Sequence, residues 1–125
     1  MEARIRIERV EKNGVTVAVV TEGAAITDAA SAMEIAMTAR YETGCSRIAI
    51  DKKLVCGDFF ILSTRLAGEI LQKLMNYRVK MAVYGDYSRY TSKPLHDFIY
   101  ESNQGNDFFF VATKEEAAEK LANAG

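Results

Sequence analysis

The chain has 125 residues, of which 49% are hydrophobic and 26% are charged, and this composition is typical of one globular domain that closes a core unaided. Sixteen Lys and Arg residues against seventeen Asp and Glu residues leave a formal charge of −1, which excludes a global attraction to nucleic acid or to an anionic membrane. No apolar stretch approaches the roughly 20 residues that span a bilayer, and the opening MEARIRIERV lacks the apolar core of a secretion signal. We therefore expect one cytoplasmic domain, residues 1–125, that binds neither nucleic acid nor membrane.

The two cysteines are expected to remain reduced thiols, because nothing in the sequence indicates secretion. Cys45 and Cys56 stand eleven positions apart and the chain has one histidine, His96, so the usual zinc-ligand spacings are absent. Both cysteines are interpreted as small buried hydrophobes. We expect neither a metal site nor a cofactor.

The N-terminus predicts a β-hairpin. Residues 3–10 alternate apolar and charged side chains, as in a strand with one wet face. Asn13-Gly14 provides the positive φ angles of a tight turn, and residues 15–20 form an apolar partner strand.

A first helix is predicted from Thr27 or Asp28, either of which can cap it, to Gly44. Its expected inward-facing positions recur at helical spacing: Met33, Ile35, Ala36, Met37 and Tyr41. A short strand, residues 47–51, follows it.

Asp58 is predicted to cap a second helix that ends near Asn76. Its expected apolar stripe consists of Phe59, Leu62, Leu66, Ile70, Leu71 and Leu74. Gly68 interrupts this helix at a cost of about 1 kcal/mol relative to alanine, and we expect close approach of another backbone to explain it.

The rest of the chain predicts strand, helix, strand and helix. Residues 79–84 form an apolar strand, Pro94 opens a third helix that stops at Gly105, and residues 107–112 form the last strand. Thr113 and Glu116 make a capping box for the final helix. The predicted fold is a single α/β domain with an N-terminal β-hairpin, then alternating helices and strands, in a mainly parallel five-stranded sheet with four helices.

Several motifs carry a resemblance to a known family. They are YETGC (41–45), DFF (58–60), LAGEILQK (66–73), NYRVK (76–80) and above all YTSK-x-L-x-DFIYESN (90–103). Over residues 5–121 the chain resembles an uncharacterised bacterial domain-of-unknown-function family. That resemblance implies a fold without an assigned activity.

More distantly, the order of elements looks like the STAS fold of anti-sigma-factor antagonists and of the cytosolic domains of sulfate transporters. Antagonists of that type carry an Asp-Ser-Ser-Gly run between strand and helix, where the second serine is phosphorylated to release a partner. The matching place here reads Asp58-Phe59-Phe60-Ile61. The aspartate is retained, whereas the serines that such a phosphorylation switch needs are absent.

The expected binding edge lies at the carboxyl ends of the parallel strands, where loops converge. Asp51, Lys52 and Lys53 follow the third strand, and the loop GDYSRYTSKP (85–94) follows the fourth. A turn at Gly85-Asp86, a cap at Thr91 or Ser92 and Pro94 account for part of that loop, and the remaining aromatic and charged residues are candidates for recognition. The candidate partner- or ligand-binding residues are Asp58, Asp86, Tyr87, Arg89, Tyr90, Ser92 and Lys93.

No set of residues forms a catalytic signature. His96 and Asp97 are adjacent, but neighbours on a helix point about 100° apart and do not readily form a dyad. We expect a non-enzymatic cytosolic regulatory or protein-interaction module that binds a protein partner, or itself as a dimer, through the loops after strands three and four. The alternative is a sensor of a small anionic ligand, or a weak enzyme, that uses the same edge.

Overall fold

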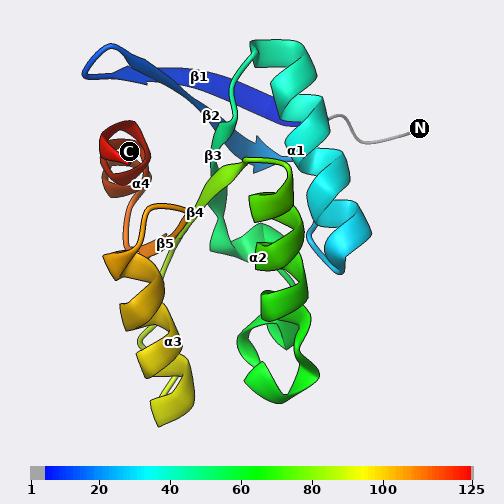
Figure 1. The fold of residues 1–125 in the computed structure, drawn as a ribbon, viewed down its shortest axis with the longest axis vertical. Coiled ribbons are helices and arrows are strands. Elements are labelled where there is room, and N and C mark those ends of the chain that lie inside the picture. The colour runs from blue at the N-terminus through cyan, green and yellow to red at the C-terminus, as the bar shows by residue number, and fades with distance from the viewer. Residues whose placement is uncertain (1–4, 125) are drawn as a thin grey trace.

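The computed structural model describes residues 5–124, and its N-terminal part is the predicted hairpin (Figure 1). Strands β1 (Arg6–Lys12) and β2 (Val15–Glu22) pair antiparallel. The turn between them has φ angles of 53° at Asn13 and 80° at Gly14, as the Asn-Gly pair requires. Residues 3 and 4 of the predicted first strand lie outside the described residues.

Three further strands complete a five-stranded sheet in the order β1-β2-β3-β4-β5. Strands β3 (Arg47–Asp51), β4 (Lys80–Tyr84) and β5 (Phe108–Val111) pair parallel with their neighbours, and β3 also pairs parallel with β2. The predicted α/β class, with a mainly parallel sheet and four helices, is confirmed.

The four helices divide unequally between the two faces of the sheet. They are α1 (Ala29–Thr43), α2 (Leu66–Asn76), α3 (Lys93–Gln104) and α4 (Lys114–Asn123). Each crossover from β2 to β5 steps to the next strand in the same direction, so right-handed connections place α1, α2 and α3 on one face. The last helix, α4, follows β5 and packs on the opposite face, as Figure 1 shows for α4 against α1 and α2.

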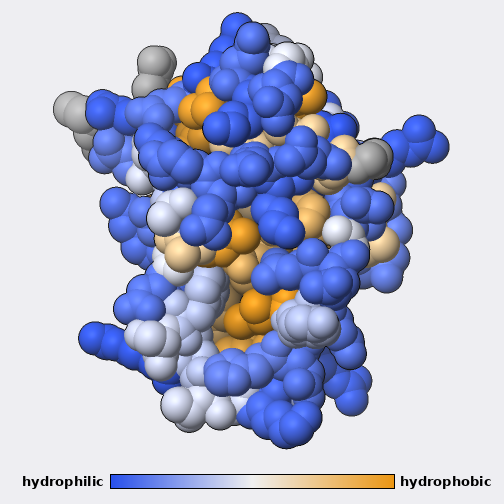
Figure 2. Space-filling view, turned by 90° about the vertical axis from the view of Figure 1, so that its left-hand side faces the viewer, coloured by the Kyte–Doolittle hydropathy of each residue, from blue (hydrophilic) through white to orange (hydrophobic). Residues whose placement is uncertain are grey.

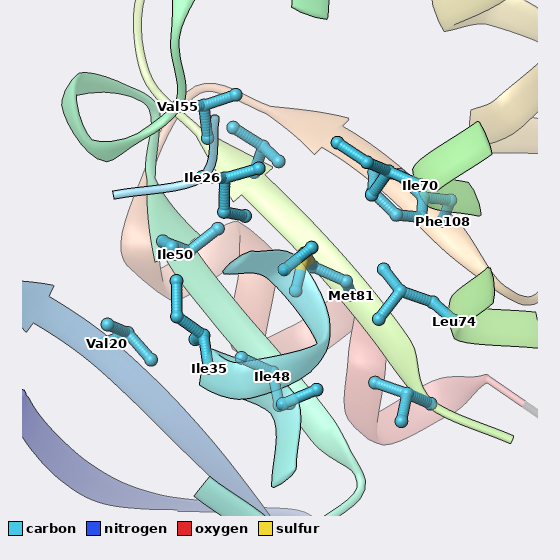
Figure 3. Close-up of a cluster of buried hydrophobic side chains, with 14 of the residues drawn as sticks. Val20, Ile26, Ile35, Ile48, Ile50, Val55, Ile70, Leu74, Met81 and Phe108 are labelled. Carbon is cyan, nitrogen blue, oxygen red and sulfur yellow. The ribbon is translucent and has the colours of Figure 1, made fainter. Parts of the chain in front are cut away.

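Successive side chains of each strand point to opposite faces of the sheet, so each face has its own hydrophobic core. Ile48, Ile50 and Met81 point toward the three-helix face, where Figure 3 shows them beside Ile35 of α1 and Leu74 of α2. The other face is covered by α4 and buries the alternate residues of the same strands, such as Ala49 and Ala82. The continuous apolarity of these strands follows from burial on both faces.

The predicted start of the second helix is wrong. The chain between β3 and α2 instead forms three short 3₁₀ turns, Lys52–Leu54, Gly57–Phe60 and Leu62–Thr64, and α2 begins at Leu66. Asp58 therefore lies inside a 3₁₀ turn and does not cap α2. The irregular path allows both Phe59 and Phe60 to be buried, whereas adjacent positions on one α-helix point about 100° apart.

Two other predicted packing positions are also wrong. Tyr41 is 91% exposed, because the buried positions of α1, which include Ala36 and Ala39, lie on the other side of the helix. A Cβ atom at Gly68 would meet no atom within 4 Å, so no backbone of the described chain approaches it closely. The caps of α1 are confirmed: Asp28 accepts from the Ser31 N–H at 2.7 Å, and Gly44 ends the helix in the left-handed conformation.

The third helix is capped as expected and also protects the edge strand β5. Ser92 is its N-cap, Pro94 lies in its first turn and Gly105 follows its end. The Asn103 amide donates to the Phe110 carbonyl oxygen at 3.0 Å and accepts from the Phe110 N–H at 2.7 Å. These two hydrogen bonds satisfy the outward-facing N–H and C=O groups of Phe110 on the apolar edge strand. Thr113 caps α4, as predicted from the capping box.

Candidate functional site

Four side chains from two loops meet at the carboxyl-terminal edge of the sheet. Lys52 follows β3, Phe60 lies in the next 3₁₀ turns, and Tyr87 and Tyr90 follow β4. The Lys52 Nζ atom lies 4.7 Å from the ring centroid of Tyr90, 5.5 Å from that of Phe60 and 5.8 Å from that of Tyr87. We call these four residues the rim cluster.

The three rings of the rim cluster pack against one another and against the core. The rings of Phe60 and Tyr90 stack with centroids 5.0 Å apart and planes 21° apart. Tyr87 meets Phe60 edge to face at 6.0 Å, and both contact the buried ring of Phe110 at 6.1–6.3 Å. Such offset and edge-to-face arrangements are favourable for aromatic rings. The segments near positions 52, 58 and 90 were predicted to share one rim and do so, but the middle segment contributes Phe60 to the cluster.

Gly85 allows the Lys52 side chain to pass across the end of β4. A Cβ atom at Gly85 would lie 2.6 Å from Lys52 Cβ and 3.2 Å from Lys52 Cδ, which is too close for either atom to remain in place. The glycine at this position is therefore explained by a close approach of a side-chain stem. Within residues 5–124, Lys52 forms no ion pair, and its ammonium faces the three rings instead.

Tyr87 is held in place by its hydroxyl group. The hydroxyl donates to the Val83 carbonyl oxygen at 2.6 Å, beneath the loop. Burial raises the pKa of Tyr87 above its ordinary value of 10.0, and the neighbouring Tyr90 and Asp51 add to the effect. The ring is therefore neutral over the physiological range and behaves as an anchored wall of the rim cluster.

Replacing Tyr87 with phenylalanine is expected to cost about 1 kcal/mol at pH 8, because the hydrogen bond to Val83 is lost. In the wild type, the raised pKa favours the folded state fully below pH 10, and this contribution is lost as the pH rises from there toward the folded pKa. Tyr87→Phe has no hydroxyl at this position and so does not lose this contribution. The difference in free energy of unfolding between the wild type and the variant should therefore become smaller from pH 8 to pH 11. Urea unfolding at both pH values measures the two curves.

The exposed Tyr100 provides the control for this experiment, because Tyr100→Phe removes a phenol hydroxyl group that is not buried. Tyr84, whose pKa is also raised by burial, is present in every variant and cancels in the comparison. If the wild type and Tyr87→Phe lose the same free energy of unfolding between pH 8 and pH 11, the raised pKa of Tyr87 does not contribute to stability as described.

Three of the predicted site residues also have a role in the local structure. The Asp86 carboxylate accepts from the Ser88 N–H at 2.8 Å, and this hydrogen bond, with help from the charges of Lys52 and Arg89, lowers the pKa of Asp86. Ser92 caps α3. Lys93 forms an ion pair with Asp97 at 2.8 Å, and this partner raises the pKa of Lys93.

The remaining two predicted residues are exposed. Arg89 lies on the loop after β4, and Asp58 lies two positions before Phe60, with its side chain in solvent. The Asp58 carbonyl oxygen accepts from the Thr64 hydroxyl at 2.9 Å, which stabilises the turn. Both side chains are therefore available to a partner at the rim.

The sequence did not assign Phe60 to the site, because a phenylalanine next to another phenylalanine is equally expected in a core. No spacing rule relates it to Tyr90, thirty positions away. His96 is exposed, and its Nε2 atom contacts the carbonyl oxygen of Tyr90 in the loop. Only the tertiary contact identifies both roles.

Three hollows on the described surface lie away from the rim cluster. One is bordered by the exposed face of α2 with Leu62 and Phe98, one by α4, and one by the segment before α1 with Ile5. Figure 2 views the side that carries α3 and α4 and shows apolar surface recessed between hydrophilic side chains. None of these three hollows is lined by Lys52, Phe60, Tyr87 or Tyr90.

The described residues contain no cluster of three or more His, Cys, Asp or Glu side chains that could hold a metal ion. Within residues 5–124, no helix has both the length and the apolarity to cross a membrane.

The comparisons with known proteins agree with the resemblance seen in the motifs. Neither the curated proteins nor the solved structures include a match to this chain. A family model described as a domain of unknown function, DUF4180, matches residues 12–121, which covers most of the chain. The chain therefore belongs to the DUF4180 family.

Proposed function

We propose that this protein is a non-enzymatic regulatory or protein-interaction module that binds a protein partner through the loops after β3 and β4. The observation that carries the proposal is the rim itself, where Tyr87, Tyr90 and the exposed Arg89 stand on one loop at a rigid sheet edge. Tyrosine and arginine are the residue types that most often anchor protein interfaces. Loops on such a scaffold commonly carry recognition.

The STAS-like order of elements supports this proposal. A hairpin followed by alternating helices and strands is the order seen here, and the turn that bears the regulatory serines in STAS antagonists corresponds to residues 58–61. In this protein that turn contributes Phe60 to the rim cluster. We propose that partner binding here proceeds without phosphorylation of that turn, because it carries no serine.

The shape of the rim also favours a macromolecular partner. Its three rings pack against one another with the Lys52 ammonium over them, and the three hollows described above lie elsewhere. Concave, apolar pockets are typical of small-molecule sites, whereas half-buried tyrosine rings beside an exposed arginine suit a protein interface. The partner is either another protein of the cytoplasm or a second copy of this chain.

The double variant Arg89→Ala with Tyr90→Ala is expected to reduce partner capture at least tenfold in pull-down and crosslinking, and to reduce any self-association measured by sedimentation equilibrium. A matched control replaces one exposed tyrosine and one exposed arginine at the opposite sheet edge, Tyr41→Ala with Arg78→Ala, and should bind normally. Equal partners and equal yields from the rim variant and the wild type remove the loop as a binding surface.

A sensor of a small anionic ligand, or a weak enzyme acting on one, is the second candidate. It is favoured by Lys52, Lys53 and Arg89, which form no ion pair within the described part of the chain. A ligand that prefers the native state must raise the melting temperature. Phosphate and carboxylate compounds should then stabilise the wild type and not the variant Lys53→Ala with Arg89→Ala; no shift across such a screen rejects this candidate.

A further inference from the structure

The rim cluster has the composition and geometry of an aromatic cage for an organic cation. One ammonium nitrogen, Lys52 Nζ, lies within 6 Å of three ring centroids from two separate loops. Ring faces attract cations through their quadrupoles, and groups of such rings are used to recognise alkylated ammonium groups. In this protein the occupant of the cage is a side chain of the same molecule.

The rings of the cage are fixed independently of the lysine. Phe60 is 5% exposed and packs on Phe59 with centroids 5.0 Å apart, and its ring remains in the core whatever lies above it. Tyr87 is anchored by its hydrogen bond to Val83, and the ring of Tyr90 stacks on Phe60 with centroids 5.0 Å apart. The cage therefore keeps its walls when the lysine side chain moves away.

Lys52 itself is held only loosely. Within residues 5–124 its ammonium has no hydrogen bond to an acceptor and no ion pair, so the ring faces are its main contacts. A lysine side chain is a flexible four-carbon stem that can rotate into solvent with full hydration of its charge. Another cation can thus replace it without breaking a salt bridge.

The charges nearest the cage favour a cation over an anion. Asp51 lies directly before Lys52 and its charge acts on Tyr87, and Asp86 lies close enough to feel the charge of Lys52. When the Lys52 ammonium leaves the rings, these two carboxylates, which accept from the Lys53 and Ser88 N–H groups, stay in the two loops that carry the rings. Lys53 and Arg89 are also on the rim, but both are exposed and neither points over a ring at cation–π distance in the described contacts.

We propose that the rim cluster is a binding site for an alkylammonium group, namely a lysine or methylated lysine side chain of a protein partner, and that Lys52 occupies the site until the partner displaces it. The identity of the partner rests on the proposed function, whereas the cage and its preference for organic cations do not. No bond is made or broken in this exchange; one ammonium replaces another.

The first test uses tetramethylammonium as the probe and Lys52→Ala as the protein. Removing the competing lysine should tighten tetramethylammonium binding at least tenfold relative to the wild type, measured by saturation-transfer NMR and by tyrosine fluorescence, with sodium chloride at equal ionic strength as the control. Adding Phe60→Leu to Lys52→Ala, which keeps an apolar side chain but removes a ring, should abolish the gain. Binding by Lys52→Ala no tighter than the wild type, or a gain that survives Phe60→Leu, overturns the proposal.

A second test needs no variant, and so it decides the matter even where a substitution prevents folding. Ring currents should shift the ε-methylene protons of Lys52 upfield in the wild type, because Nζ lies 4.7 Å from the Tyr90 centroid. Excess tetramethylammonium should return these protons to the value of an exposed lysine, and sodium should not. Unchanged shifts at saturating tetramethylammonium overturn the displacement.

The two proposals fail separately. If the variant Arg89→Ala with Tyr90→Ala loses the partner while tetramethylammonium neither binds Lys52→Ala nor moves the Lys52 protons, the rim is an interface without a cation site. If tetramethylammonium binds as expected but the same variant keeps all partners, the cage exists and the proposed protein-binding function is wrong.

Discussion

Replacing Phe59 with alanine is expected to lower the free energy of unfolding by about 3–5 kcal/mol. Phe59 is 1% exposed, and its ring lies 5.0 Å from Phe60, 6.0 Å from Phe110 and 6.3 Å from Phe108. Removing it leaves a cavity between the 3₁₀ turns and β5, at a place where the surrounding rings have little freedom to close in. Such a loss is a large part of the stability of an ordinary domain, which is about 5–15 kcal/mol.

Urea unfolding followed by circular dichroism measures this loss. Phe59→Leu, which keeps most of the apolar volume, is the matched control and should cost about 1.5 kcal/mol or less. Because Phe59 supports Phe60 from below, the alanine variant should also weaken the stacking of Phe60 on Tyr90 and so loosen the rim. A loss below about 1 kcal/mol for Phe59→Ala contradicts the packing described here.

Gly85→Ala is expected to destabilise the protein by about 1–3 kcal/mol, as overpacking of a filled site does. The new methyl group would lie 2.6 Å from Lys52 Cβ, which belongs to the base of the side chain and cannot move without its backbone. The substitution should therefore also push Lys52 out of the aromatic cage. The expected signs are a lower melting temperature and loss of the ring-current shift on the Lys52 ε-methylene protons.

Gly68→Ala is the matched control, because a Cβ atom there would meet nothing within 4 Å and alanine is the better helix former. Because Gly68 lies in the first turn of α2, the gain in stability should be at most about 1 kcal/mol, and the Lys52 protons should be unchanged. The contact between Gly85 and Lys52 is refuted if Gly85→Ala is as stable as the wild type. A destabilised Gly68→Ala would in turn reveal a contact at α2 that the described residues do not show.

Much of the fold could be predicted because local chemistry and periodicity act over short distances. The Asn13-Gly14 turn, the Asp28 and Gly44 caps of α1 and the Ser92 cap of α3 all depend on residues within a few positions of one another. The start of α2 could not be predicted in this way. Asp58 is a good N-cap residue, but its segment follows a bridge between Ile26 and Val55, which are far apart in the chain, and buries both Phe59 and Phe60 in a 3₁₀ turn.

The candidate site, too, was predictable from the sequence only in part. Strand alternation and the parallel order of β3 and β4 were enough to place the loops containing Lys52 and Tyr90 on one edge, because the carboxyl ends of parallel strands lie together. Which side chains meet there depends on packing between segments that no local rule connects: Phe60 turns toward Tyr90, Lys52 crosses Gly85 and Lys93 turns away to Asp97. The local sequence pattern thus determines the helices and strands and the edge of the sheet at which the loops lie. Only the close packing of the folded core, where two rings cannot occupy the same space, determines which side chains meet at the rim.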